Sequence, residues 1–264
     1  MADGRTIADR HVSGAAKFAS RIGHEELEVR FLVDSESQVP RDHESVGPLR
    51  CRVERDVNPI RGVAGVLADS TQAYRPDDYV VVLNGAQVFR EPLDELITSM
   101  LRTQADVAMV AGLDGTPVGL WLLRCAPLQT VRDVGYVDLK EQALLDWRGQ
   151  WDIRVIERQR SPALRTRSVN EYLNGVRLDA IRQLSNATID EDPYREEWER
   201  SFGVVEPNTD IAPDAVIHDS VILAGASIGK GAVVVRSVVC PGARVAPGER
   251  VAGRVVTATV KGRS

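Results

Sequence analysis

The feature that most constrains this chain is a repeat near its C-terminus. Three windows of 17 residues align without gaps, and they read IAPDAVIHDSVILAGAS from Ile211, IGKGAVVVRSVVCPGAR from Ile228 and VAPGERVAGRVVTATVK from Val245. A fixed period of this kind is typical of a solenoid, in which one turn buries its apolar face only by stacking on the next turn. The repeat therefore predicts stacked coils over residues 211–261.

Aliphatic residues recur at three phases of each window. Glycine, proline and other small residues recur between these phases, where the backbone of a coil must bend. Three short strands per turn, each with an aliphatic side chain directed inward, predict a short left-handed parallel β-helix of three 17-residue coils over residues 208–264. The alternative, an antiparallel β tail, needs no shared period. The repeated positions are Ile211, Ile228 and Val245; Ile217, Val234 and Val251; and Val221, Val238 and Val255, followed by Ile222, Val239 and Val256.

The repeat carries little catalytic chemistry of its own. It resembles the hexapeptide repeats of acyltransferases, which often use a histidine, and His218 is the only histidine in it. Three coils are few for an acyl-donor cleft, and a lone polar side chain on a coil is usually exposed. We therefore expect a scaffold or an oligomer contact, with a hexapeptide acyltransferase as a remote alternative.

The chain before the repeat alternates between helical and extended patterns. Apolar residues at helical spacing or in short continuous runs predict a layered α/β domain over residues 1–185, with a mostly parallel sheet. The predicted helices cover 11–22, 92–101, 139–147 and 169–184, and the predicted strands cover 27–33, 49–53, 79–83, 107–111, 118–123 and 152–156.

Residues 186–207 differ from both neighbouring regions. They are rich in acidic residues, and Tyr194, Trp198 and Phe202 recur at i, i+4 and i+8. That spacing predicts a short connecting helix that docks one face on a domain, with a domain boundary near Val205–Asn208.

Composition excludes several classes of function. The net charge of −5 and the absence of a concentrated basic face give no reason to expect nucleic acid as a partner. The three cysteines are far apart and lack CxxC spacing, so neither a disulfide framework nor a zinc site follows, and we expect reduced, buried thiols. No apolar run is long enough for a membrane span, and the N-terminus lacks the hydrophobic core of a signal peptide. We therefore expect a cytoplasmic protein.

Four segments together resemble the sugar nucleotidyltransferases, also called nucleotide-sugar pyrophosphorylases. RGVAGVL at 61–67 resembles the family's G-T-A-G-A-L helix start, and VVVLNG at 80–85 resembles the strand that ends in N-G-D. GLWLL at 119–123 and GYVDLKE at 135–141 resemble the G-[IV]-Y-[VL] and G-[FY]-x-D-[IL]-K-E segments. Because a hexapeptide domain is a common family attachment, the resemblance covers about residues 25–261. It implies a Rossmann-like nucleotidyltransferase domain followed by the β-helix.

The resemblance also implies nucleotide- or sugar-binding residues. Each has a structural alternative: a helix start for residues 61–65, a plain turn for Asn84–Gly85, and a solvated helix lysine for Lys140. Asp138 is interpreted as the N-cap of the helix over 139–147, because aspartate accepts the unpaired N–H groups of a first turn. The candidate binding residues are Arg61, Gly62, Ala64, Gly65, Asn84, Gly85 and Lys140.

Three parts of the family's catalytic machinery have no match. The glycine-rich G-x-G-T-R-L loop is absent, so we expect a degenerate or N-terminally truncated member of the family. Ala86 stands where the family has a metal-binding aspartate. The second metal-binding aspartate has no counterpart in SPALRT at 161–166. We therefore assign no catalytic residue and no metal ligand, and magnesium is implied only if the chain is active.

Two functions remain open from the sequence. In the first, the protein binds a nucleotide sugar, a sugar phosphate or a partner without turnover, as a regulatory or structural subunit of polysaccharide or sugar-nucleotide metabolism. In the second, it is an active nucleotidyltransferase that joins a nucleoside triphosphate to a sugar 1-phosphate. The open final coil of a three-coil β-helix predicts either a homo-oligomer or a complex with a related enzyme.

Overall fold

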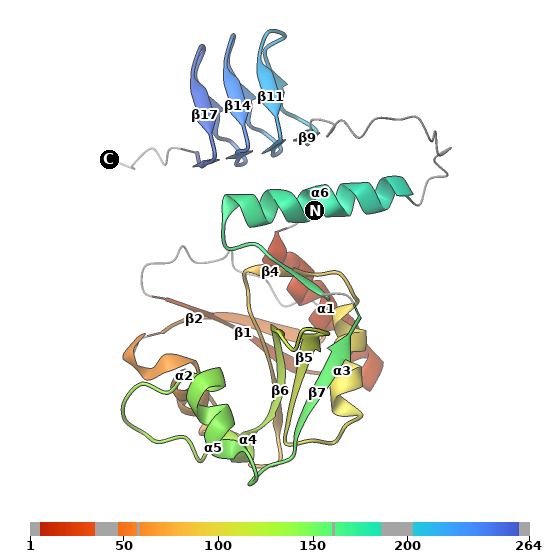
Figure 1. Ribbon diagram of the computed structural model, residues 1–264, viewed down its shortest axis with the longest axis vertical. Helices are drawn as coiled ribbons and strands as arrows, with labels where there is room; N and C mark the ends of the chain where they lie inside the picture. Colours follow the sequence, from red (N-terminus) through yellow and green to blue (C-terminus); the bar gives the residue numbers. More distant parts are fainter. Residues whose placement is uncertain (1–5, 35–46, 57–58, 160–161, 186–202, 259–264) are drawn as a thin grey trace. The chain divides into compact units, whose positions relative to one another are not determined.

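The computed structural model describes residues 6–34, 47–56, 59–159, 162–185 and 203–258 (Figure 1). It is a mixed α/β structure with several groups of parallel strands, which confirms the α/β class. The chain divides into two compact units. One is formed by residues 7–85 and 89–163, and the other by residues 164–264 with 1–6 and 86–88. Within the described ranges, no helix is long and apolar enough to cross a membrane.

A four-stranded sheet is the centre of the first unit, and it is mixed where a mostly parallel sheet was predicted. Strand β6 runs antiparallel to both β3 and β5, whereas β5 and β7 are parallel. The physical reason is the tight turn at 112–116, where the Gly112 N–H donates to the Thr116 carbonyl at 3.1 Å. A turn this short can only fold a strand back on its neighbour, because parallel strands need a long crossover. The sheet order is β3 (Tyr79–Leu83), β6 (Pro117–Arg124), β5 (Val107–Gly112) and β7 (Ile153–Arg158).

Helices cover both faces of this sheet, and each face has its own apolar core. Every residue of β5 is buried, which explains its continuous apolar sequence. On one face Leu67, Trp121 and Trp147 belong to a core built by four helical segments; on the other, Leu96 and Met100 pack on the strands. The segments of the first face are α2 (Gly62–Thr71), α4 (Cys125–Leu128), the π-helical turn η2 (Leu139–Ala143) and α5 (Leu144–Trp147); the second face is covered by α3 (Leu93–Leu101) and by part of α1 (Ile7–Ile22).

A separate pair of parallel strands packs on α1. Side chains alternate along β1 (Leu27–Val33) and β2 (Leu49–Arg55), so that one face is apolar and contacts α1. The other face is charged. Where α1 passes α3, Gly14 leaves no room for a side chain, because a Cβ atom there would lie 2.9 Å from the Leu93 Cβ. Two further short elements are the 3-10 turn η1 (Pro59–Arg61) and the strand pair of β4 (Gln87–Phe89) and β8 (Ala163–Arg165).

In the second unit, the C-terminal strands form three parallel sheets whose register is 17 residues. Ile211 pairs with Ile228, and Ile228 pairs with Val245; the other two phases pair in the same way. This is the alignment that the sequence repeat predicts. The sheets are β10 (Asp210–Ile211), β13 (Ser227–Ile228) and β16 (Arg244–Val245); β11 (Val216–His218), β14 (Val233–Val235) and β17 (Arg250–Ala252); and β9 (Gly203–Val205), β12 (Ser220–Ile222), β15 (Val238–Val239) and β18 (Val255–Val256).

The third sheet of the repeat is apolar on both sides. Ile222 and Val239 belong to the apolar core that they share with Ile228 and Val234 of the other two sheets, whereas Val221 and Val238 pack against Leu173 and other residues of α6 (Val169–Ser185). Strand pairing begins at β9, earlier than the predicted boundary near Val205–Asn208. The predicted aromatic stripe of Tyr194, Trp198 and Phe202 lies outside the described residues.

Candidate functional site

The candidate site begins at Arg61, whose guanidinium is buried and fully engaged with the protein. Its Nε and Nη2 donate to the carboxylate of Asp69 at 2.9 and 2.8 Å, and its Nη1 donates to the carbonyls of Arg132 and Gly135 at 3.0 and 3.1 Å. The hydrogen bonds from Arg61 hold the pKa of Asp69 below its ordinary value. Arg61 therefore joins α2 to the 132–137 segment, and it contacts a phosphate only if these bonds break.

Backbone hydrogen bonds join two of the segments that carry the family resemblance. The Val137 N–H donates to the Arg61 carbonyl at 2.8 Å, and the Ala64 N–H donates to the Val137 carbonyl at 3.1 Å. The bond from Ala64 occupies one of the N–H groups that a helix start could otherwise offer to an anion. The structure thus brings RGVAG and GYVD together through backbone groups of Arg61 and Ala64, two of the predicted binding residues.

Close packing explains why both glycines of RGVAG are needed at their positions. Gly62 has a φ of +69°, and a Cβ atom there would lie 2.6 Å from the Val137 carbonyl oxygen. At Gly65, a Cβ atom would lie 3.0 Å from Cζ of the Arg61 guanidinium. Both glycines therefore permit the close contact of α2 with its surroundings, and this local packing accounts for the motif without a ligand.

The segment after Val137 follows the prediction for Asp138. The Asp138 carboxylate accepts the backbone N–H groups of Lys140 and Glu141 at 2.7 and 2.9 Å, which confirms it as a helix N-cap. The Lys140 side chain is exposed at the first turn that Asp138 caps. Of the predicted binding residues in this part of the unit, Lys140 is the one whose charged group faces solvent.

Asn84 and Gly85 lie at the end of β3 and are held by a different contact. The Asn84 N–H donates to the Gly119 carbonyl at 2.9 Å, which joins the end of β3 to β6. Gly85 is exposed, and a Cβ atom there would meet nothing within 4 Å. The predicted site is therefore held by two separate sets of contacts, one at 132–137 and one at Gly119.

Ala86, which stands where the family has a metal-binding aspartate, lies beside Thr166, the last residue of the segment 161–166 that corresponds to the second aspartate. The Thr166 N–H donates to the Ala86 carbonyl at 2.9 Å, directly beside the β4–β8 strand pair. Neither position has a carboxylate, and the Thr166 hydroxyl is buried without a hydrogen-bond partner. Among the described residues no group of three or more His, Cys, Asp or Glu side chains is placed to hold a metal ion. The residues at Ala86 and Thr166 therefore do not fit a magnesium site.

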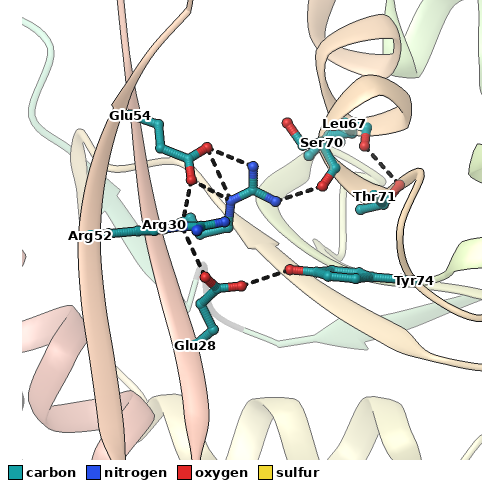
Figure 2. A network of polar contacts seen from close by, with 8 residues as sticks. All are labelled: Glu28, Arg30, Arg52, Glu54, Leu67, Ser70, Thr71 and Tyr74. Atoms are coloured by element: carbon teal, nitrogen blue, oxygen red, sulfur yellow. Dashed lines mark hydrogen bonds and ion pairs between the residues drawn. The ribbon is translucent and has the colours of Figure 1, made fainter.

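A polar network at the other end of α2 was not foreseen from the sequence (Figure 2). Arg30 donates to both carboxylate oxygens of Glu54 and, at 2.6 Å, to the Ser70 carbonyl in the last turn of α2. Arg52 pairs with Glu28 and Glu54 at 2.9 and 2.5 Å. The usable signal was the alternation of charged residues along both strands, which places them on one face of the β1–β2 pair.

Groups in this network change one another's pKa values. Hydrogen bonds from Arg30 hold the pKa of Glu54 below its ordinary value. Burial raises the pKa of Tyr74, and the hydrogen bond from its hydroxyl to Glu28 raises it further. Together with Arg61, Arg30 therefore joins α2 to the rest of the unit at both of its ends.

Other reactive side chains lie outside this region. The three cysteines are free thiols, and burial raises the pKa of each, which disfavours the reactive thiolate. His218 is exposed on the outward side of β11, with Nδ1 3.2 Å from the Asp219 carboxylate. A shallow hollow on α1 and α3 is lined by Lys17, Arg21 and Asp94, and none of the predicted binding residues lines it.

Comparison with known proteins gives no further assignment. No protein-family model matches the chain, and no curated protein sequence is significantly similar to it.

Proposed function

We propose that this protein is a nucleotide-sugar pyrophosphorylase-like subunit that binds or regulates without catalysing nucleotidyl transfer. In this proposal a Rossmann-like nucleotidyltransferase domain is joined to a short left-handed parallel β-helix, and the protein serves sugar-nucleotide or polysaccharide metabolism. The order of the four resembling segments supports it, as does the 17-residue register of the C-terminal strands.

The observation that carries the proposal is the hydrogen bond between Thr166 and Ala86. Residues 80 positions apart in the sequence meet here: Ala86 stands where the resemblance places one metal-binding aspartate, and Thr166 ends the segment 161–166 that corresponds to the second. Alanine and threonine occupy those positions, so the carboxylates that would hold magnesium against the phosphates are missing. The layout supports the family, and the side chains support an inactive member.

The chemistry explains why these two positions matter. In nucleotidyl transfer, a sugar phosphate oxygen attacks the α-phosphorus of a nucleoside triphosphate, and pyrophosphate leaves. Negative charge spreads over the phosphate oxygens, and a protein must balance it with cations and N–H groups. In this chain Arg61 is committed to Asp69, and the Ala64 N–H is committed to Val137. Of the predicted binding residues, Gly85 and Lys140 are exposed to solvent.

Two measurements on the full chain test the proposal. The first is pyrophosphate release from nucleoside triphosphates mixed with hexose 1-phosphates and magnesium, where we expect none. The second is a thermal-shift screen with nucleotides, sugar phosphates and nucleotide sugars, because a ligand that binds only the folded state raises the melting temperature. We expect a shift that does not depend on magnesium. Magnesium-dependent turnover would establish the alternative function, an active nucleotidyltransferase.

A matched variant examines the metal positions directly. Ala86→Asp with Thr166→Asp restores two carboxylates at adjacent backbone positions. We expect the double variant to gain a thermal shift with magnesium, whereas Ala86→Asn with Thr166→Asn, which adds side chains of the same size without charge, should not. Equal responses of the two double variants would show that these positions do not converge as a metal site, and the proposal would lose its main support.

A further inference from the structure

The coils of the C-terminal repeat carry opposite charges at their two ends. The first coil, residues 211–227, contains Asp214 and Asp219 and no lysine or arginine. The second, residues 228–244, contains Lys230, Arg236 and Arg244 and no carboxylate. The third, residues 245–261, contains Arg250, Arg254 and Lys261 and a single carboxylate, Glu249, which pairs with Arg254. Because the 17-residue register stacks the coils in sequence order, charge changes sign along the stack.

The three sheets of the repeat differ in what they present outward. The sheet of β9, β12, β15 and β18 is covered by α6 along Val221 and Val238. The sheet of β10, β13 and β16 presents Asp210, Ser227 and Arg244, which are polar. The sheet of β11, β14 and β17 (Figure 1) presents mostly apolar side chains, and Val216 at its edge is 53% exposed. Its outward positions are Val216, Val233 and Arg250, and His218, Val235 and Ala252.

We infer that the outward face of the β11–β14–β17 sheet binds a second copy of this chain, with the two stacks of coils antiparallel. Two identical faces meet through a two-fold axis in the plane of contact. An axis parallel to the strands places the acidic first coil of one copy against the basic third coil of the other. An axis along the stack would place like charges together, which costs free energy in an interface.

The register then specifies the contacts. Val233 and Val235 of the middle coil lie nearest the axis and meet the same residues of the second copy. Arg250 then lies opposite Val216 of the second copy, at the end of the first-coil strand where Asp214 lies. An apolar centre with charged residues at its edges is the usual layout of a protein interface.

The size of the face determines how strong the contact is. Three strands about 4.8 Å apart, each of three residues at about 3.3 Å per residue, span an area about 10 Å across in each direction. Even with the corner residues added, this is well below the roughly 800 Å² per partner of a stable interface. The dimer should therefore be weak, and it should require both the apolar centre and the charges.

Sedimentation equilibrium of the full chain tests this inference. From about 10 µM to about 1 mM protein, the mean mass should rise from 28.9 kDa towards twice that value. The rise should shrink between about 0.05 M and 0.5 M NaCl, because salt screens the charge pairs. A chain that stays monomeric at every concentration in low salt would overturn the inference. Masses beyond the dimer would overturn it in favour of open-ended stacking of the coils.

Variants separate this face and this orientation from others. Val233→Glu places two carboxylates at the axis and should abolish dimerisation, whereas Val255→Glu, at the exposed end of the sheet that α6 covers, should leave it unchanged. Asp214→Arg and Arg250→Asp should each weaken the dimer, and the double variant should restore it. A Val233→Glu variant that still dimerises would exclude the face, and a double variant no stronger than the single ones would exclude the antiparallel orientation.

Discussion

Gly229 offers the sharpest test of the stacked 17-residue coils, because its surroundings are made by the next coil. A Cβ atom on Gly229 would lie 2.5 Å from the Pro247 nitrogen, 2.8 Å from the Ala246 carbonyl carbon and 2.8 Å from the Pro247 Cδ. Backbone and a proline ring cannot rotate away as a flexible side chain can. The Gly229→Ala variant must therefore push the third coil away from the second, against the hydrogen bond from the Gly229 N–H to the Val245 carbonyl at 2.9 Å.

The magnitude follows from a matched glycine in the neighbouring strand β9, which pairs with β12 of the repeat. Gly203 has no positive φ, and a Cβ atom there would meet nothing within 4 Å. Both alanine variants gain about 0.4–1 kcal/mol, because alanine reduces the entropy of the unfolded chain. Overpacking costs Gly229→Ala a further ~1–3 kcal/mol. The difference between the two variants should therefore be about 1–3 kcal/mol.

Hydrogen exchange followed by mass spectrometry measures this difference locally. We expect the amides in residues 227–245 to exchange through opening of the coils. A difference of about 1–3 kcal/mol then corresponds to about 5- to 150-fold faster exchange in Gly229→Ala than in Gly203→Ala, since about 1.4 kcal/mol is a factor of ten. Gly203→Ala should exchange no faster than the unmodified protein. Equal exchange in the two variants would refute the stacking register, because the clash exists only if residue 229 faces residues 246–247.

Three further predictions address other parts of the chain. Ile228→Asp should destabilise the repeat by roughly 2–5 kcal/mol, because Ile228 is buried and an unpaired charge there is costly. His218→Ala, at an exposed position, should change the unfolding free energy little. Equal effects of the two variants in a denaturant titration would show that the predicted inward-facing positions are wrong. Gly62→Ala should lower the melting temperature more than Gly85→Ala, because only the first adds a Cβ atom at positive φ and 2.6 Å from a carbonyl oxygen; a calorimetric scan in which both variants melt together would contradict this. The pKa of Glu54 is lowered in the folded state, so its pair with Arg30 stabilises the fold above the unfolded-state pKa and this contribution is lost as pH falls through the folded-state pKa. Glu54→Gln should therefore flatten the acid limb of stability measured by urea unfolding at several pH values, and an unchanged slope would argue against the pair.

Local patterns in the sequence determine several features of this protein. The 17-residue period predicts which residues pair between coils, because a repeated phase must recur at the same place in each turn. The strands at 27–33 and 79–83 have the predicted bounds, and Asp138 caps a helix as its position implies. These features depend on neighbouring residues or on a repeat, and both can be read along the chain.

Other features arise only where distant segments meet. The sequence around Arg61 does not indicate whether this arginine binds a phosphate or groups of the protein itself. Two of its acceptors, the carbonyls of Arg132 and Gly135, belong to residues more than 70 positions away. The meeting of Ala86 with Thr166 has the same origin. The direction of β6 was decided by the turn at 112–116, and the two-sided apolar character of Val221 and Ile222 by packing of α6. In each case the deciding term is a contact between segments, which no local pattern of the chain contains.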